Sequence, residues 1–152
     1  SPRGWEDVSN VLASSLDDAT RRVFVQGRLG AANAADFFGV LDAIRSGSDV
    51  HALLAAAPGE ATRALLPRSL DALYGLVYGL VAAVEDGTTL DRAFAIVEQF
   101  VDLAGTLPAR ECETLVAELL LERALSRGLD AELYASAAFA RYGERRDAER
   151  SA

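Results

Sequence analysis

Apolar residues recur at helical spacing along almost the whole chain, in segments separated by short stretches of Gly, Pro, Asp and Ser. No segment of the 152 residues sustains the alternation of β-branched and polar residues that is typical of strands. We therefore predict an all-α fold, a compact bundle of about seven helices without a sheet. A folded chain of this length hides roughly 70% of the surface that it exposes when unfolded, which is enough for a sizeable core.

The first helix is predicted to begin at Ser1, which can cap it, and to end near Ser15. Its apolar stripe consists of Trp5, Val8, Val11 and Leu12.

Asp17 can cap a second helix, which would place Val23 and Phe24 inward and stop at Gly27. The segment Gly27-Arg28-Leu29-Gly30 would then be a tight corner before a third helix, from about Ala31 to Ser46. The apolar face of that helix consists of Ala34, Phe37, Phe38, Leu41 and Ile44.

Residues 48–68 carry the weakest helical pattern, and we predict a connection there with one short helix around Leu53. Ser69 then opens an apolar segment, Leu70 to Val84, which is too short to span a membrane and is predicted to be a helix buried on most sides. Gly75 and Gly79 lie four residues apart on one face, which would let a neighbouring helix approach closely.

Three more helices complete the predicted bundle. Thr88 or Thr89 caps the first, which ends at Gly105; Pro108 starts the second, which Gly128 stops. The inward residues of the first are predicted to be Leu90, Phe94, Val97, Phe100 and Val101, and those of the second Leu115, Val116, Leu119 and Leu120.

The last helix is predicted to be capped by Asp130 and to run through Leu133, Tyr134 and Phe139. Residues 1–142 would form a single helical domain, made of the first three helices in 1–46, the connection in 48–68 and the bundle in 69–142. Residues 143–152 have no apolar face and are predicted to be a polar tail, as frayed or exposed helix.

The composition excludes several kinds of chemistry. All fifteen basic residues are Arg, so the chain can form neither a phosphate-binding Gly-Lys-Ser/Thr loop nor a lysine Schiff base. With one His and one Cys, a metal site of several imidazoles or thiolates and a disulfide framework are also excluded. We predict no metal site, no cofactor and no catalytic residue in this chain.

The net charge of −8 bears on the partners, because acidic residues exceed arginines in every third of the chain. Nucleic acids and anionic lipid surfaces require a cationic face, so neither is an expected partner. No apolar stretch follows the first residues, so we expect no signal peptide and a cytoplasmic protein.

The sequence contains two candidate reactive sites. Cys112 lies in the first turn of its predicted helix, where the helix dipole favours thiolate, but Glu111 and Glu113 oppose it, so we interpret the cysteine as structural. His51 is the one possible imidazole base, and a dyad with Cys112 stays open as an alternative. Glu118 and Glu122 could hold a hard cation, but beside Arg123 and Arg127 a solvated charged face is favoured.

Several short motifs fall within the first 40 residues: Ser1-Pro2-Arg3, Trp5, Val8-Ser9, Gly27-Arg28-Leu29-Gly30 and Ala34-Ala35-Asp36-Phe37. Together they resemble the carboxyl-terminal part of bacterial MoxR-like AAA+ ATPases. In that superfamily a Ser-Pro-Arg at the head of a lid helix carries the sensor-2 arginine, which reaches the γ-phosphate of bound nucleotide. The resemblance implies that Arg3 is this arginine and that residues 1–46 are lid-like.

The departures from that family define the expected role. The Gly-rich loop with its Lys, the acidic strand end that holds Mg²⁺ and the arginine finger are missing from the sequence. The resemblance therefore implies a non-catalytic lid and helical extension, with ATP and Mg²⁺ bound by the parent protein. It also implies contacts with the chain's own AAA+ core, with neighbouring subunits and with a von Willebrand factor A-type partner.

The alternative reading of the sequence is a self-contained helical scaffold or adaptor, whose apolar groove binds a partner helix. The third interpretation is a small enzyme that uses Cys112.

Overall fold

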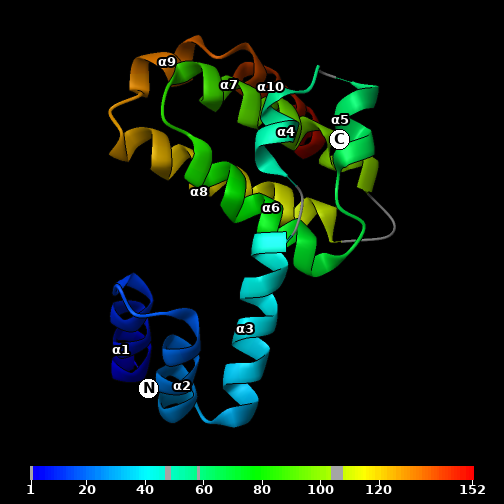
Figure 1. Ribbon diagram of the computed structural model, residues 1–152. Coiled ribbons are helices and arrows are strands. Elements are labelled where there is room, and N and C mark those ends of the chain that lie inside the picture. Colours follow the sequence, from blue (N-terminus) through cyan, green and yellow to red (C-terminus); the bar gives the residue numbers. More distant parts are fainter. Residues whose placement is uncertain (1, 47–48, 58, 104–107) are drawn as a thin grey trace. The chain divides into compact units, whose positions relative to one another are not determined.

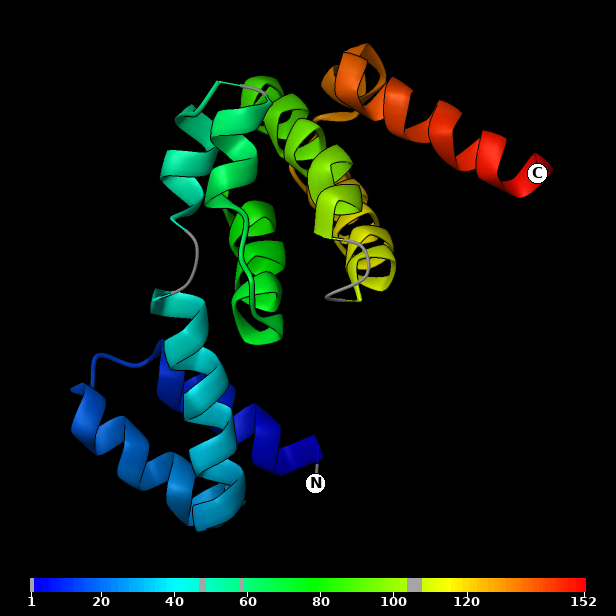
Figure 2. The same ribbon diagram turned by 90° about the vertical axis from the view of Figure 1, so that its right-hand side faces the viewer.

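The computed structural model describes the chain except residues 1, 47–48, 58 and 104–107, and its regular elements are helices (Figures 1 and 2). The described part contains ten α-helices and one 3-10 helix but no strand, which confirms the all-α prediction. Seven of the α-helices have seven residues or more, in agreement with the predicted number. The other three have six residues each.

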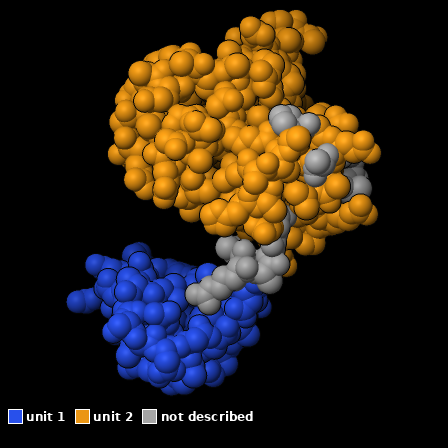
Figure 3. All heavy atoms as spheres, turned by 45° about the horizontal axis from the view of Figure 1, so that its top comes forward, with its two compact units in different colours: residues 1–43 blue, residues 44–152 orange. Residues whose placement is uncertain are grey.

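Contacts divide the chain into two compact units, Ser1–Ala43 and Ile44–Ala152, which Figure 3 colours separately. The division falls within helix α3 (Ala31–Ser46), close to the end of the predicted segment 1–46. It differs from the prediction of a single domain over 1–142. The physical reason is that buried apolar residues form two clusters, one in each unit, and each cluster has its own set of helices.

The first unit is built from α1 (Pro2–Ala13), α2 (Asp18–Leu29) and α3. Its buried residues are Val8, Val25, Ala34 and Phe38. The predicted inward positions on α2 are wrong, because Val23 and Phe24 are 69% and 53% exposed. Val25 faces the cluster instead, and at about 100° per residue its two predecessors point elsewhere.

The predicted end of α2 at Gly27 is also wrong. The helix continues through Leu29, and its C-cap is Gly30, whose amide donates to the carbonyl of Gln26. Gly30 has φ of 82°, a left-handed conformation that favours glycine, whereas Gly27 lies within the helix. At the other end, Asp17 caps α2 as predicted, because its carboxylate accepts from the Thr20 amide.

The core of the second unit lies among α6 (Leu70–Ala83), α7 (Gly87–Val97), α8 (Ala109–Ser126) and α10 (Ala137–Ser151). Helix α6 packs beside α8, and α10 packs beside α7. Six of the predicted inward residues of α7, the 3-10 helix that follows it and α8 are fully buried: Leu90, Phe94, Val97, Phe100, Val116 and Leu120. The predicted Leu115 and Leu119 are half-buried. Val101 is an exception, since it is 56% exposed after α7 gives way to the 3-10 helix Glu98–Leu103.

Two short helices occupy the predicted connection. They are α4 (Val50–Ala55), capped by Asp49, and α5 (Glu60–Leu65), and α4 packs against α6 and α7. Leu53 is fully buried, so this segment contributes to the core. The structure thus contains one more helix here than the pattern predicted.

Local capping signals account for several helix ends. Ser69 caps α6 as predicted, by accepting from the Ala72 amide. The cap of α7 is Asp86 rather than Thr88 or Thr89, and Thr89 is its partner in a capping box. Gly128 ends α8 as predicted, with φ of 68°.

The last predicted helix is interrupted. Helix α9 (Asp130–Ala135) ends before Ser136, which caps α10. Residues 143–151 continue α10 as regular helix, seen in Figure 2 as the red end of the chain. Several of their side chains bond to other helices, so the segment is more than a polar tail.

No helix in the described part of the chain combines the length and the apolar character needed to cross a bilayer.

Gly79 permits the close approach of α4 to α6, as the spacing of Gly75 and Gly79 predicted. A Cβ atom at Gly79 would lie 2.6 Å from Cγ2 of Val50, whereas one at Gly143 would meet nothing within 4 Å.

We expect Gly79→Ala to lower the free energy of unfolding by about 1 kcal/mol, because overpacking outweighs the gain in helix propensity. The matched control Gly143→Ala should raise it by about 0.5–1 kcal/mol. Chemical denaturation measures both. Equal stabilisation by the two substitutions would contradict the close packing, and Val50→Ala should remove the penalty in a double-mutant cycle.

Candidate functional site

Arg3, the predicted nucleotide-sensing residue, is exposed in the first turn of α1. Among the residues that the structure describes, none forms an ion pair with it, and the first turn holds no acidic residue. The amino-terminal end of a helix is also the positive end of its dipole. The guanidinium is therefore free to bind an anion such as phosphate.

Trp5 lies on the same helix, and it is 51% exposed although it was predicted on the inward stripe. Its ring packs on Phe37 at a centroid distance of 5.8 Å, and on α1 Asp7 forms an ion pair of 2.9 Å with Arg28. Trp5, Phe37 and Arg28 border an open hollow of about 450 Å³ within the first unit. Its lining residues are Trp5, Arg28, Leu29, Asn33, Asp36, Phe37 and Val40.

Cys112 and His51 have different surroundings. Cys112 is 1% exposed in the core of the second unit, and burial, assisted by the charge of Glu111, raises the pKa of its thiol. His51 is exposed and lines a groove of about 700 Å³ with Gly79, Ala82 and Glu85. No hydrogen bond between the two is found in the described part of the chain. The structural interpretation of Cys112 agrees with this burial.

Glu118 and Glu122 are both exposed on α8. Arg123, predicted to share their solvated face, instead donates from Nε to the Val84 carbonyl at 3.3 Å and from Nη2 to that of Ala82 at 3.4 Å. It therefore satisfies carbonyls at the end of α6. In the described residues no group of three or more His, Cys, Asp or Glu is placed to hold a metal ion.

Arg92 on α7 is a polar residue that the sequence analysis missed. Its guanidinium donates to the carbonyls of Leu53, Leu54 and Ala56, at the carboxyl end of α4. It also donates to Oγ1 of Thr62 on α5 at 3.2 Å, and the Thr62 hydroxyl donates to the Ala57 carbonyl. One arginine thus holds both short helices against α7.

Asp91, next to it on α7, caps a different helix. Its Oδ1 accepts from the Ser136 hydroxyl at 2.7 Å and from the Ala138 amide at 3.1 Å. The Ser136 hydrogen bond, then the Ala138 amide and the charge of Arg141, lower the pKa of Asp91. This contact explains why α9 and α10 are separate helices.

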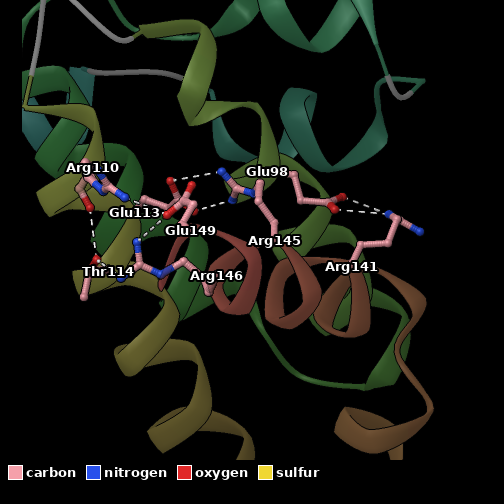
Figure 4. A network of polar contacts seen from close by, with 8 residues as sticks. All are labelled: Glu98, Arg110, Glu113, Thr114, Arg141, Arg145, Arg146 and Glu149. Atoms are coloured by element: carbon pink, nitrogen blue, oxygen red, sulfur yellow. Dashed lines mark hydrogen bonds and ion pairs between the residues drawn. The ribbon is translucent and has the colours of Figure 1, made fainter. Parts of the chain in front are cut away.

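A network of charged side chains joins α10 to α8 (Figure 4). Glu113 is 5% exposed, and both of its carboxylate oxygens accept from Arg145. On the same face of α10, Glu149 accepts from Arg110 at 2.7 Å and from Arg146 at 3.3 Å. A buried carboxylate needs such a partner, since an isolated buried charge is costly.

The network extends to the 3-10 helix, where Arg141 forms a bidentate pair with Glu98 at 2.9 and 3.1 Å (Figure 4). Residues 141, 145 and 149 repeat every four positions, so they share one face of α10. That spacing is visible in the sequence, but a charged helix face is also typical of solvent exposure, so the spacing alone does not predict the network.

The chain matches no protein-family model, and comparison with curated proteins and with solved structures gives no match.

Because its raised pKa keeps the Cys112 thiol protonated, we expect the folded protein to react with an aromatic disulfide reagent at pH 8 at least about tenfold more slowly than the unfolded chain. Stopped-flow absorbance in buffer and in concentrated denaturant measures the two rates. The Cys112→Ser variant supplies the background. Equal rates in the two conditions would show an accessible, reactive thiol.

Asp91 should make stability depend on pH. Its pKa is lowered in the folded state from 3.8, so its contribution is complete above that value and is lost as the pH falls through the folded pKa. We expect Asp91→Asn to lower the free energy of unfolding by about 1 kcal/mol at pH 7. The difference in the free energy of unfolding between the variant and the wild type should shrink below pH 3.8. A difference in the free energy of unfolding that does not change with pH would contradict this role. So would an equal destabilisation by the exposed control Asp147→Asn.

Proposed function

We propose that this chain is the non-catalytic, carboxyl-terminal helical module of a MoxR-like AAA+ ATPase, and that Arg3 senses the bound nucleotide. The observation that supports the proposal is the placement of Arg3. It is exposed in the first turn of the helix that opens a compact three-helix unit, without an ion-pair partner among the described residues. The family assignment itself rests on the motifs of the first 40 residues.

The proposed mechanism is electrostatic. A guanidinium binds a triphosphate more tightly than a diphosphate, because the γ-phosphate adds charge and oxygen acceptors in the geometry of its fork. Nucleotide turnover would then shift the equilibrium between two arrangements of the lid. The parent's core would supply the loop lysine and the Mg²⁺ ligands, since this sequence has no Lys.

The partners follow from the same proposal. They are the AAA+ core of the parent, its neighbouring subunits and a von Willebrand factor A-type protein that the assembly remodels. The module would transmit the nucleotide state and carry out no chemistry itself.

A second candidate function is that of a helical adaptor for protein–protein interaction. It is favoured by the exposed large apolar side chains of the first unit, since exposed apolar surface can mark a protein-interaction site. They are Trp5 (51% exposed), Leu16 (38%), Val23 (69%), Phe24 (53%) and Val40 (45%). The two candidates differ in what precedes Ser1 in the gene, because the first requires a phosphate-binding loop about two hundred residues upstream.

To test the nucleotide role, the module is expressed with its native upstream region and the ATPase rate is measured for Arg3→Ala. We expect the loss of a charged hydrogen bond to reduce the rate or the affinity for ATP by at least about tenfold. The affinity for ADP should change less. Arg3→Lys should recover only part of the loss, since an ammonium group cannot form the bidentate contact.

The control is Arg150→Ala, which removes an exposed arginine from the other unit. Thermal denaturation should be unaltered in both variants because both side chains are exposed. If Arg3→Ala leaves the rate and both nucleotide affinities unchanged, the sensor assignment is wrong and the adaptor function is favoured.

A further inference from the structure

Helix α8 carries a stripe of carboxylates that faces solvent. Glu111, Glu118 and Glu122 are exposed, and with half-buried Leu115 and 60% exposed Leu125 they follow one another at alternating steps of three and four residues. Residues at that spacing lie along one side of an α-helix. We call these five residues the α8 stripe.

Two arginines, Arg110 and Arg146, lie beside the stripe, around the hollow that Glu111 and Glu118 line. None of the stripe's three carboxylates forms an ion pair within the described residues, because the neighbouring arginines bond elsewhere. Arg123 bonds to the carbonyls of α6, and Arg110 bonds to Glu149. By contrast Glu113, on the inward side of the same helix, is fully paired with Arg145.

The three carboxylates of the stripe therefore have no direct ion-pair partner within the described part of the chain. Glu118 and Glu122 are four residues apart, a spacing at which like charges destabilise a helix. The unit that contains them has seventeen acidic residues against eleven arginines, so the surrounding potential is negative as well. A cationic partner would relieve this repulsion on binding.

Apolar surface accompanies the charge. Leu125 is exposed at one end of the stripe. Near the other end, Leu115 lines an open hollow of about 460 Å³ together with Arg110, Glu111, Thr114, Glu118 and Arg146. An aliphatic side chain can therefore be received among these charged and polar groups, which distinguishes the stripe from a uniformly charged surface.

We propose that the α8 stripe binds a basic amphipathic helix of a partner protein. Such a helix would place Arg or Lys opposite Glu111, Glu118 and Glu122 and aliphatic side chains against Leu115 and Leu125. A helix is the fitting shape because the charged and apolar residues of the stripe repeat with helical period. The proposal concerns the second unit, and it does not depend on Arg3 or on nucleotide.

The test uses the whole chain and a synthetic peptide as long as α8. The peptide has Arg where the stripe has Glu and Leu where the stripe has Leu, in a background of Ala and Gln. Binding is measured by fluorescence anisotropy at low and at physiological salt. We expect saturable binding that weakens as salt is added, because exposed ion pairs are screened.

The decisive variant is Glu111→Gln with Glu118→Gln and Glu122→Gln. It should bind the peptide about tenfold more weakly, which corresponds to about 1.4 kcal/mol. The matched control changes Glu60, Glu85 and Glu144 to Gln, all exposed and outside the stripe, and removes the same net charge. The control variant should lose less than about twofold in affinity for the peptide. Circular dichroism verifies that both variants fold.

Two further variants make the test specific. Leu125→Ala should weaken binding without affecting stability, since the side chain is exposed. Replacing the three stripe glutamates by Arg should abolish binding of the basic peptide and create binding of a peptide with Glu in place of its Arg.

Three results would overturn the proposal. The first is no binding of the basic peptide at low salt. The second is equal weakening by the two triple variants, which would indicate attraction to net charge alone. The third is concentration-dependent self-association in sedimentation that only the stripe variant abolishes, which would make a second copy of the chain the occupant.

Discussion

The burial of helix α7 is the constraint on which the second unit depends. Leu90, Ala93, Phe94, Ile96 and Val97 are all fully buried, and α7 contacts α4, α6, α8, α9 and α10. Phe94 packs against the rings of Phe139 and Tyr142 on α10, at centroid distances of 5.1 and 6.0 Å. Each large apolar side chain buried in this way contributes about 1.5–3 kcal/mol, so the surrounding helices are held mainly by their contact with one central helix.

The polar residues of α7 explain where sequence reasoning succeeded and where it failed. The helix ends at Ser69 and Gly128 could be predicted because the capping group lies within a few residues of the backbone that it satisfies. The second short helix of the connection, α5, and the break at Ser136 could not. The contacts that hold them come from Arg92 and Asp91, which are thirty or more residues away in sequence and become neighbours only after α7 is buried.

The same distinction applies to functional residues. Arg3 could be singled out from its place beside Pro2, and Cys112 could be interpreted as structural from its acidic neighbours, because both judgements use adjacent residues. The buried pair of Glu113 and Arg145 was beyond local reasoning, because a glutamate that faces inward and one that faces solvent have the same local sequence pattern. Which face of α8 is inward is decided by the helices that pack against it, α6 and α7 among them.

The exclusive use of arginine connects the internal network with the outer surface. A guanidinium has five donors in a planar fork, so one Arg can satisfy several carbonyls, as Arg92 does, or both oxygens of a carboxylate, as Arg145 does. An ammonium group would leave some of these acceptors unpaired. Arginines engaged in this way are held away from outer carboxylates such as Glu118, and the fifteen arginines are outnumbered by twenty-three acidic residues, so some carboxylates on outward faces are left without an ion-pair partner. The internal stability of the second unit and the negative charge of the α8 stripe therefore have one origin, the commitment of its arginines to helix ends and buried carboxylates.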